Sequence, residues 1–159
     1  MISIDEIRLK LSEKPLFAEF DQAELECLVS LMDVELFESG ALVVRQDAPG
    51  ECMYLVYEGE ARVVHHREEH SVDLARLRSG DFFGEVALVD HGLRSADVVA
   101  VERCTMLKIN QGTLSALAGV YPSGAYKLLL ALGRILVERL RQSNRRYVDS
   151  LFFHEVAKG

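Results

Sequence analysis

Residues Gly84, Glu85 and Arg94 have the types and the spacing to bind an anionic ligand that also carries hydroxyl groups. Glu85 opens a short apolar turn over residues 86–88, and a helix start there would offer free backbone N–H groups and a positive dipole end, which favour phosphate. Gly84 lets the backbone come close to the ligand. Arg94 adds a planar cation suited to holding a phosphate in one orientation. Because a phosphate would repel a carboxylate, Glu85 is expected to accept hydrogen bonds from neutral groups such as sugar hydroxyls.

These residues lie in the stretch 80–98, GDFFGEVALVDHGLRSADV, which resembles the phosphate-binding cassette of cyclic-nucleotide-binding domains, the family of the catabolite activator protein and of protein kinase A regulatory subunits. The resemblance is carried by Phe83-Gly84-Glu85, Ala87-Leu88, Arg94-Ser95-Ala96 and Val98. It implies that Arg94 and the backbone amides around Val86, Ala87 and Ser95 bind the cyclic phosphate of cAMP or cGMP, and that Glu85 binds the ribose 2′-hydroxyl. The candidate ligand-binding residues of the cassette are Phe83, Gly84, Glu85, Val86, Ala87, Arg94, Ser95 and Ala96.

Asp97 departs from the family pattern, which usually has threonine, serine or another uncharged residue at this position. If the strand alternates from Arg94 inward, the Asp97 side chain faces outward and does not affect the ligand. If it does not alternate in this way, a second acid near the phosphate would weaken binding.

The composition restricts the class of protein. The chain has 159 residues, of which 49% are hydrophobic, and a formal net charge of −7, so we expect one domain with a core and no general affinity for nucleic acid. Cys27, Cys52 and Cys104 are odd in number and widely separated, which predicts buried free thiols in a reducing compartment. No apolar run approaches the roughly 20 residues of a membrane span, and a cytoplasmic protein is expected.

Residues 1–33 carry two helical patterns. An apolar stripe at helical spacing runs over residues 2–11, and Pro15 ends that segment. Asp21 with Glu24 forms a capping box for a second helix. Both helices are interpreted as packing elements.

Residues 34–110 change from a helical to a strand period. Seven short β-rich runs are separated by glycine-bearing turns, which is typical of an antiparallel β-barrel or jelly roll and not of a parallel sheet. The predicted strands are 34–37, 42–46, 53–57, 61–66, 72–77, 94–101 and 106–109. Apart from Gly84, the turn glycines are interpreted as residues that need positive φ, namely Gly40, Gly50, Gly59 and Gly80.

The last part of the chain, 111–159, predicts a short helix over 111–121, a break at Pro122 and a long helix from 123 to about 151. A seam with alternating spacings of four and three indicates a coiled coil, hence a parallel homodimer; a stripe that packs on its own barrel is the alternative. The seam consists of Leu129, Gly133, Leu136, Leu140, Ser143, Tyr147 and Ser150.

The family resemblance extends into this helix, where residues 139–144 are similar to the segment whose polar side chains reach the purine. It implies that Ser143 and Asn144 recognise the base, although on the residues alone a polar residue that sets the coiled-coil register is an equal alternative. Arg139, Arg141, Arg145 and Arg146 form a local basic cluster that is interpreted as a solvated helix face.

The expected fold class is therefore α+β: an antiparallel β-barrel of the jelly-roll type, or double-stranded β-helix, with N-terminal helices and a long C-terminal helix. We expect a single domain over 1–159, with a helical lead-in at 1–33, the barrel at 34–110 and C-terminal helices at 111–159. His65, His66 and His70 match no standard metal-ligand spacing, and no metal or other cofactor is expected.

Three classes of function remain. The first is a stand-alone dimeric module that binds cAMP or a related cyclic nucleotide and signals to an unknown protein through its C-terminal helix. The second is a dimeric interaction scaffold that has kept the fold and lost the ligand. The third, an enzyme such as a phosphodiesterase, is disfavoured because no metal cluster or general base stands beside the phosphate site. Only eight residues follow residue 151, so no helix-turn-helix domain and no direct DNA binding are expected.

Overall fold

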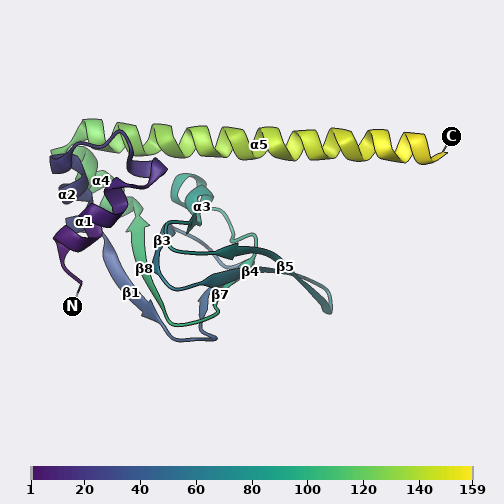
Figure 1. Cartoon of the computed structure of the whole chain (residues 1–159), viewed down its shortest axis with the longest axis horizontal. Coiled ribbons are helices and arrows are strands. Elements are labelled where there is room, and N and C mark those ends of the chain that lie inside the picture. The colour runs from purple at the N-terminus through teal and green to yellow at the C-terminus, as the bar shows by residue number, and fades with distance from the viewer. Residues whose placement is uncertain (1, 159) are drawn as a thin grey trace.

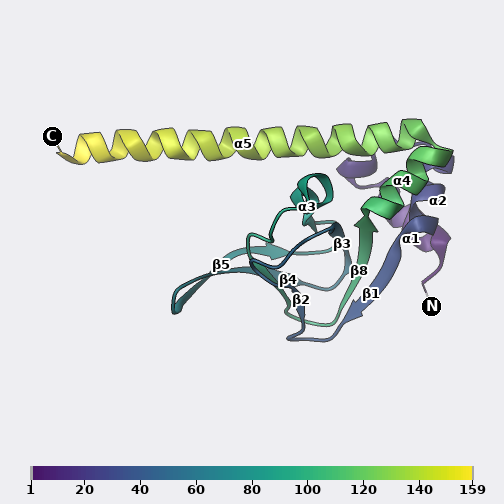
Figure 2. The same cartoon turned by 180° about the vertical axis from the view of Figure 1, so that it is seen from behind.

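A computed structural model describes residues 2–158, so the predicted domain ends at 1 and 159 lie outside the described residues. Two antiparallel sheets form a barrel, helices cover one end of it, and a long C-terminal helix runs past it (Figure 1, Figure 2). The helices are α1 (Ile4–Ser12), the short 3-10 helix η1 (Pro15–Phe17), α2 (Gln22–Leu31), α3 (Glu85–Asp90), α4 (Gln111–Val120) and α5 (Pro122–Lys158). The strands are β1 (Asp33–Phe37), β2 (Leu42–Val44), β3 (Cys52–Glu58), β4 (Ala61–Arg67), β5 (His70–Leu77), β6 (Phe82–Phe83), β7 (Asp97–Ala100) and β8 (Cys104–Asn110).

The sheet topology confirms the predicted fold class. One sheet has the strand order β1-β8-β3-β6 and the other β2-β7-β4-β5, and every named pair is antiparallel. Apart from the β4–β5 hairpin, neighbouring strands in each sheet are distant in sequence, as in a jelly roll. The sheets therefore face each other across an interior, and the loops between their strands meet at the barrel ends.

Strand β3 explains how two cores share one sheet. Its side chains alternate: Met53 and Leu55 join a cluster formed with the helices, whereas Tyr54 and Val56 join a second cluster between the two sheets. Because both faces are covered, six of its seven residues are buried. The helical end is thus fixed to the barrel through one strand.

Helix α5 is longer than the sequence predicts and continues to Lys158. Its 37 residues correspond to about 55 Å at the rise of an α-helix. Leu128 and Leu132 anchor its first half in the helical core, while all residues from Val137 to Lys158 are exposed. Figure 1 shows α5 running past α3 and ending beyond the β4–β5 hairpin, and within this half Arg139 contacts Glu85 of α3.

The strand predicted over 94–101 begins only at Asp97. Arg94 leaves the ladder because its backbone pairs with the loop after β2: Arg94 N donates to Ala48 O, and Asp47 N donates to Arg94 O, both at 2.8 Å. For the same reason β2 ends at Val44, before the predicted residue 46. The sequence pattern also missed β6, which has two residues.

The predicted capping box of α2 is confirmed, and it has a second role. Asp21 accepts from Glu24 N at 2.8 Å, and Glu24 accepts from Asp21 N at 2.9 Å. The buried Glu24 carboxylate also accepts from Ser123 Oγ at 2.6 Å and from Lys127 Nζ at 2.7 Å, both at the start of α5. Glu24 therefore joins the N-terminal helices to the base of α5.

We expect Glu24→Ala to lower the free energy of unfolding by about 1–3 kcal/mol at neutral pH, because charge-assisted hydrogen bonds are lost at a buried site. Burial opposes the charged form, yet hydrogen bonds from Lys127, Ser123 and Asp21 hold the pKa of Glu24 below its ordinary value. A lowered carboxyl pKa contributes stability above the unfolded value, about 4.3, and loses it as the pH falls through the lowered folded value.

Denaturant unfolding at several pH values measures this effect. The difference between wild type and variant should be largest near neutral pH and shrink below about pH 4. Glu26→Ala, an exposed acid on the same helix, is the matched control and should change little. An equal loss in both variants would contradict the role of Glu24.

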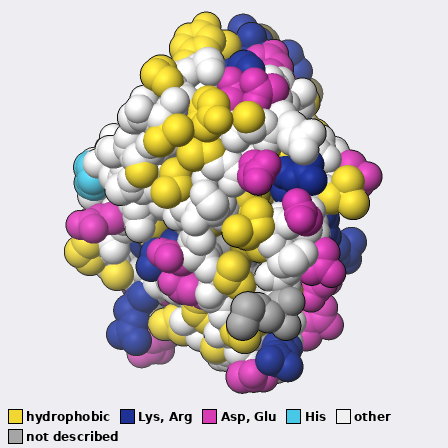
Figure 3. Space-filling view, turned by 90° about the vertical axis from the view of Figure 1, so that its left-hand side faces the viewer, with side chains coloured by type: hydrophobic (Ala, Val, Ile, Leu, Met, Phe, Trp, Pro, Cys, Tyr) yellow, Lys and Arg dark blue, Asp and Glu magenta, His cyan; other side chains and the backbone are white. Residues whose placement is uncertain are grey.

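The surface at the helical end carries mixed charge. Figure 3 shows acidic and basic side chains next to each other there, with apolar side chains between them. Within residues 2–158, none of the helices combines the length and the apolar character that crossing a bilayer requires.

Candidate functional site

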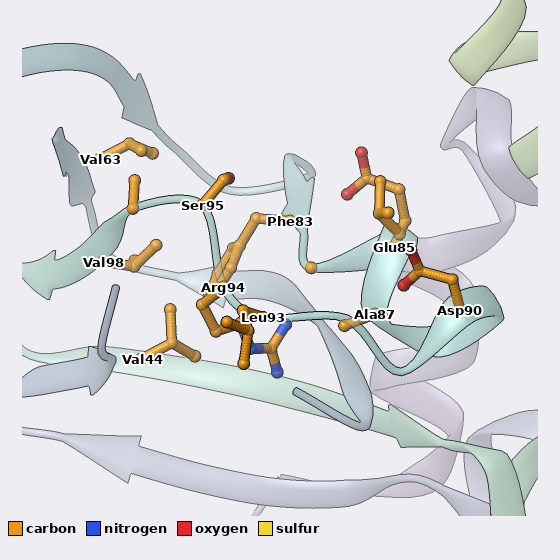
Figure 4. A pocket seen from close by; sticks show the side chains of 13 residues that line it. Val44, Val63, Phe83, Glu85, Ala87, Asp90, Leu93, Arg94, Ser95 and Val98 are labelled. Atoms are coloured by element: carbon orange, nitrogen blue, oxygen red, sulfur yellow. The ribbon is translucent and has the colours of Figure 1, made fainter. Parts of the chain in front are cut away.

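A cavity of about 240 Å³ opens between α3 and the sheet β2-β7-β4-β5 (Figure 4). Its walls combine apolar side chains from separate strands with the polar groups of the cassette. The apolar wall is formed by Val44, Val63, Leu93 and Val98. The cassette contributes Phe83, Gly84, Glu85, Val86, Ala87, Arg94, Ser95 and Ala96, so all eight cassette residues singled out in the sequence line one cavity.

Arg94 passes between two glycine backbones. A Cβ on Gly50 would lie only 2.5 Å from Arg94 Nε, and a Cβ on Gly84 would meet Arg94 Nη1 even more closely. Gly50 therefore corrects the turn interpretation: it does not have positive φ, and it is needed because the arginine side chain lies against it. Gly84 has φ of 79°, a left-handed conformation that suits glycine.

The guanidinium of Arg94 is buried but only partly satisfied. Arg94 is 8% exposed, and its Nη2 donates to Cys52 Sγ at 3.3 Å. Nη1 has no hydrogen-bond acceptor among the described residues. Buried N–H groups without acceptors are rare in folded proteins, and each calls for an explanation such as a ligand. Next to Gly84, this donor is placed to receive an anion.

Glu85 is also buried, and its partner comes from the long helix. Arg139 of α5 donates through Nη1 to Glu85 Oε1, and its guanidinium carbon lies 5.2 Å from the centre of the Phe82 ring. Arg139 stays half exposed, as a solvated basic face predicts, but it also pairs with Glu85, because tertiary packing brings α5 over α3. In Figure 4 the Glu85 carboxylate and the Arg94 guanidinium lie on opposite sides of the pocket.

Helix α3 is held from several sides. Gln111 of α4 donates to Leu88 O at 3.0 Å, and the Leu88 side chain is buried. At its end, His91 adopts a left-handed conformation with φ of 56°, and its N–H donates to Ala87 O at 3.1 Å. These contacts fix the backbone amides at the start of α3 beside Arg94.

Asp97 points away from the cavity and corresponds to the outward alternative. It accepts from Gln46 N at 2.6 Å and from His66 Nε2 at 2.8 Å, and it is not among the residues that line the cavity. On the neighbouring strand position, His65 Nδ1 donates to Ser95 O at 3.0 Å. The two histidines thus hold the cassette from β4, and the described residues contain no metal-binding group of three or more side chains.

The structure does not bring Ser143 and Asn144 to this cavity. Both are exposed on the part of α5 beyond the barrel, and neither lines the pocket of this chain. The sequence did not single out Val44, Val63 and Leu93 of the apolar wall, or Arg139, as site residues. Strand alternation could have marked the valines, whereas Arg139 has no local signal.

Residues 34–120, more than half of the chain, match the family model described as "Cyclic nucleotide-binding domain". The chain belongs to this family. It is 33% identical over 142 residues to the cyclic AMP receptor protein of Thermus thermophilus, covering 89% of this chain and 63% of that protein. It is 30% identical over 109 residues to the cAMP-dependent protein kinase regulatory subunit of Schizosaccharomyces pombe, covering 69% of this chain and 26% of that subunit.

The fold agrees with this family. The crystal structure of the Thermus thermophilus catabolite activator protein has a TM-score of 0.78 with 30% identity, covering 88% of this chain and 64% of that one. The chain thus spans only part of the length of these relatives, about a quarter to two thirds. Its cassette cavity lies between α3 and the sheet β2-β7-β4-β5, and Arg139 of α5 reaches Glu85, one of the lining residues.

Proposed function

We propose that this domain binds a cyclic nucleotide, in the first place cAMP, and passes the binding event on through α5. The observation that carries the proposal is the buried Nη1 of Arg94, a cationic donor without an acceptor among the described residues, in the same cavity as the Glu85 carboxylate. The cation suits the cyclic phosphate, and the carboxylate suits the ribose 2′-hydroxyl. The names of the relatives from Thermus thermophilus and Schizosaccharomyces pombe point to cAMP.

The size of the cavity supports a particular placement of the ligand. Pockets for drug-sized ligands usually measure about 300–1,000 Å³, and this one has about 240 Å³. The phosphate and ribose would occupy the enclosed part between Arg94 and Glu85, next to the apolar wall. The base would then extend toward the opening and α5.

The Glu85–Arg139 contact supports transmission through α5. A ribose hydroxyl at Glu85 would approach the carboxylate that Arg139 now binds, and this changes a contact between α3 and the helix. A ligand shifts a conformational equilibrium only by its differential affinity for the two states. In this proposal the postures of α5 differ at Arg139, and the nucleotide binds one of them more tightly.

The exposed half of α5 supports a homodimer. Leu140 and Tyr147 of the predicted seam lie in this half and are 61% and 67% exposed. A stripe of this kind buries its apolar side chains when two helices pair in parallel. Because α5 leaves the barrel here, the alternative of packing on its own barrel does not account for these residues.

Ser143 and Asn144 are proposed to recognise the base, after a movement of α5 or from a second copy. We expect the double variant Ser143→Ala, Asn144→Ala to change the ratio of the affinities for cAMP and cGMP more than it changes either affinity, because hydrogen bonds to the base edge distinguish the purines. Competition binding with both nucleotides measures the preference. Gln142→Ala is an adjacent exposed control. An unchanged preference with intact binding would remove both residues from the site.

A comparison of cAMP with 2′-deoxy-cAMP tests the proposed function at one atom. Calorimetry should give weaker binding of the deoxy analogue to wild type, by about 1.5–3 kcal/mol for a hydrogen bond to a charged group. Glu85→Ala should weaken cAMP and lose this discrimination. Asp90→Ala, a second acid that lines the cavity, should keep it. Equal binding of both analogues to wild type would contradict the assignment of Glu85.

A ligand-free dimeric scaffold is the second candidate, and one observation favours it. Glu85 and one arm of Arg94 already have partners within the chain, Arg139 and Cys52. If these contacts are permanent, no nucleotide enters. Absence of both heat and thermal shift with millimolar cAMP and cGMP would favour the scaffold.

A further inference from the structure

A second cavity lies on the other side of Arg94. It has about 760 Å³ and is formed by β2, the loop after it, β3, the end of β8 and the start of α4. Arg94 and Val44 line both cavities, so the arginine belongs to the wall between them. Cys52 is among the residues that line this second cavity, and it is 8% exposed.

The sulfur of Cys52 lies against a cationic donor. Arg94 Nη2 donates to Cys52 Sγ at 3.3 Å, and a cationic donor stabilises a negative sulfur. Lys108 lines the same cavity. A hydrogen bond with Glu35 raises the pKa of Lys108, burial opposes this, and the charges of Glu35 and Cys52 add to the rise.

Cys104, in the same barrel, has a sulfur that donates hydrogen bonds instead of accepting one from a cation. Its Sγ donates to the backbone carbonyls of Glu60 and Glu102, each at 3.2 Å, which requires the protonated thiol. Burial raises the pKa of Cys104. Cys27, partly buried on α2, packs against the helical core. The three free cysteines therefore differ in what faces their sulfur.

The unpartnered arm of Arg94 is the second observation that points to this site. Arg94 is more than nine-tenths buried, its Nη2 is already on Cys52, and its Nη1 has no acceptor within residues 2–158. An oxygen atom added to Cys52 Sγ would be an acceptor in front of the guanidinium fork. Such an oxygen would bind the arginine more strongly than the thiol does.

We propose that Cys52 is a redox modification site. Oxidation by hydrogen peroxide would form a sulfenate whose oxygen accepts hydrogen bonds from Arg94. The thiolate attacks one oxygen of hydrogen peroxide; the S–O bond forms as the O–O bond breaks, which gives a sulfenic acid and hydroxide. The hydroxide then takes the proton of the sulfenic acid, leaving the sulfenate and water. The sulfur is oxidised by two electrons and the peroxide is reduced. The consequence for nucleotide affinity rests on the proposed function, because the same arginine would bind the phosphate.

Labelling of the intact protein tests the site without any nucleotide. The protein is treated with hydrogen peroxide and dimedone, which reacts with sulfenic acids, and each cysteine is followed by mass spectrometry. Cys52 should be labelled several-fold faster than Cys104 and Cys27, because the Cys52 sulfur accepts a hydrogen bond from a guanidinium whereas the Cys104 thiol donates to backbone carbonyls. Labelling of Cys52 at the rate of Cys104 would overturn the proposal. Arg94→Gln, once shown to be folded by circular dichroism, should abolish the preference.

Affinity for cAMP before and after peroxide tests the consequence. Oxidation should weaken binding by about tenfold, with recovery on treatment with dithiothreitol, because a charged oxygen competes for Arg94. Cys52→Ser should be insensitive to peroxide. Labelled wild type with unchanged affinity would overturn the regulatory consequence. If reduced wild type binds no nucleotide while Cys52 is labelled selectively, the proposed function fails and the modification site stands.

Discussion

Replacing Arg94 by alanine is expected to weaken cAMP binding by about 2–5 kcal/mol, because a partly buried phosphate would lose its only planar cationic partner in the proposed arrangement. Arg94 is 8% exposed and its guanidinium lies against the backbones of Gly50 and Gly84, which hold it in one place. Arg94→Lys should fall between wild type and Arg94→Ala, since it keeps the charge and loses the two-armed donor. Isothermal calorimetry gives the affinities.

Arg103→Ala is the matched control for this measurement. Arg103 is an exposed arginine before β8 with one surface ion pair to Glu38 at 3.5 Å. Its removal should change affinity and stability by less than about 0.5 kcal/mol. Folding of each variant is checked by circular dichroism. Wild-type affinity in folded Arg94→Ala would refute the assignment of the pocket.

The features that could be read from the sequence are local ones. Gly84 and Glu85 are adjacent, and the backbone conformation of Gly84 follows from the tight entry into α3. The capping box of α2 needs only residues three apart, Asp21 and Glu24. The fold class followed from glycine-bearing turns between short strands, and the comparison with solved structures confirms it.

The features that the sequence did not reveal are contacts between distant segments. Arg139 and Glu85 are 54 positions apart, and nothing near either residue indicates the other. Gly50 resembles a turn glycine until Arg94 is seen to lie against it. Cys52 has an ordinary place in an apolar strand, and only the fold puts its sulfur on the arginine. Side-chain positions at the site therefore depend on tertiary packing that periodicity does not report.

The strand that begins at Asp97 shows how such packing moves a strand start away from the position that the sequence pattern predicts. Apolar alternation extends the strand back to Arg94, but the loop at Asp47 and Ala48 takes the Arg94 backbone out of the ladder. This displacement lets the Arg94 side chain enter the wall between the two cavities. Asp97, the first residue that does pair as a strand, then faces His66 on the outside.

Leu132→Ala is expected to lower the free energy of unfolding by about 2–5 kcal/mol, because it removes a large buried side chain and leaves a cavity in the helical core. Leu132 is 1% exposed and packs with the cluster that joins α1, α2, α4 and the base of α5 to the barrel. Denaturant unfolding at low protein concentration measures the effect on the single chain, since a dimer would add a concentration-dependent term.

Leu140→Ala, two turns further along α5, is the matched control for the same substitution. Leu140 is 61% exposed in the single chain, so its loss should change the stability at low concentration by less than about 0.5 kcal/mol. If the seam pairs two chains, the same variant should instead weaken dimerisation in sedimentation at higher concentration. The two leucines thus separate the half of α5 that belongs to the core from the half proposed for a second copy. An equal loss of stability in both variants at low concentration would show that the projecting half also packs within the chain, and would contradict this division.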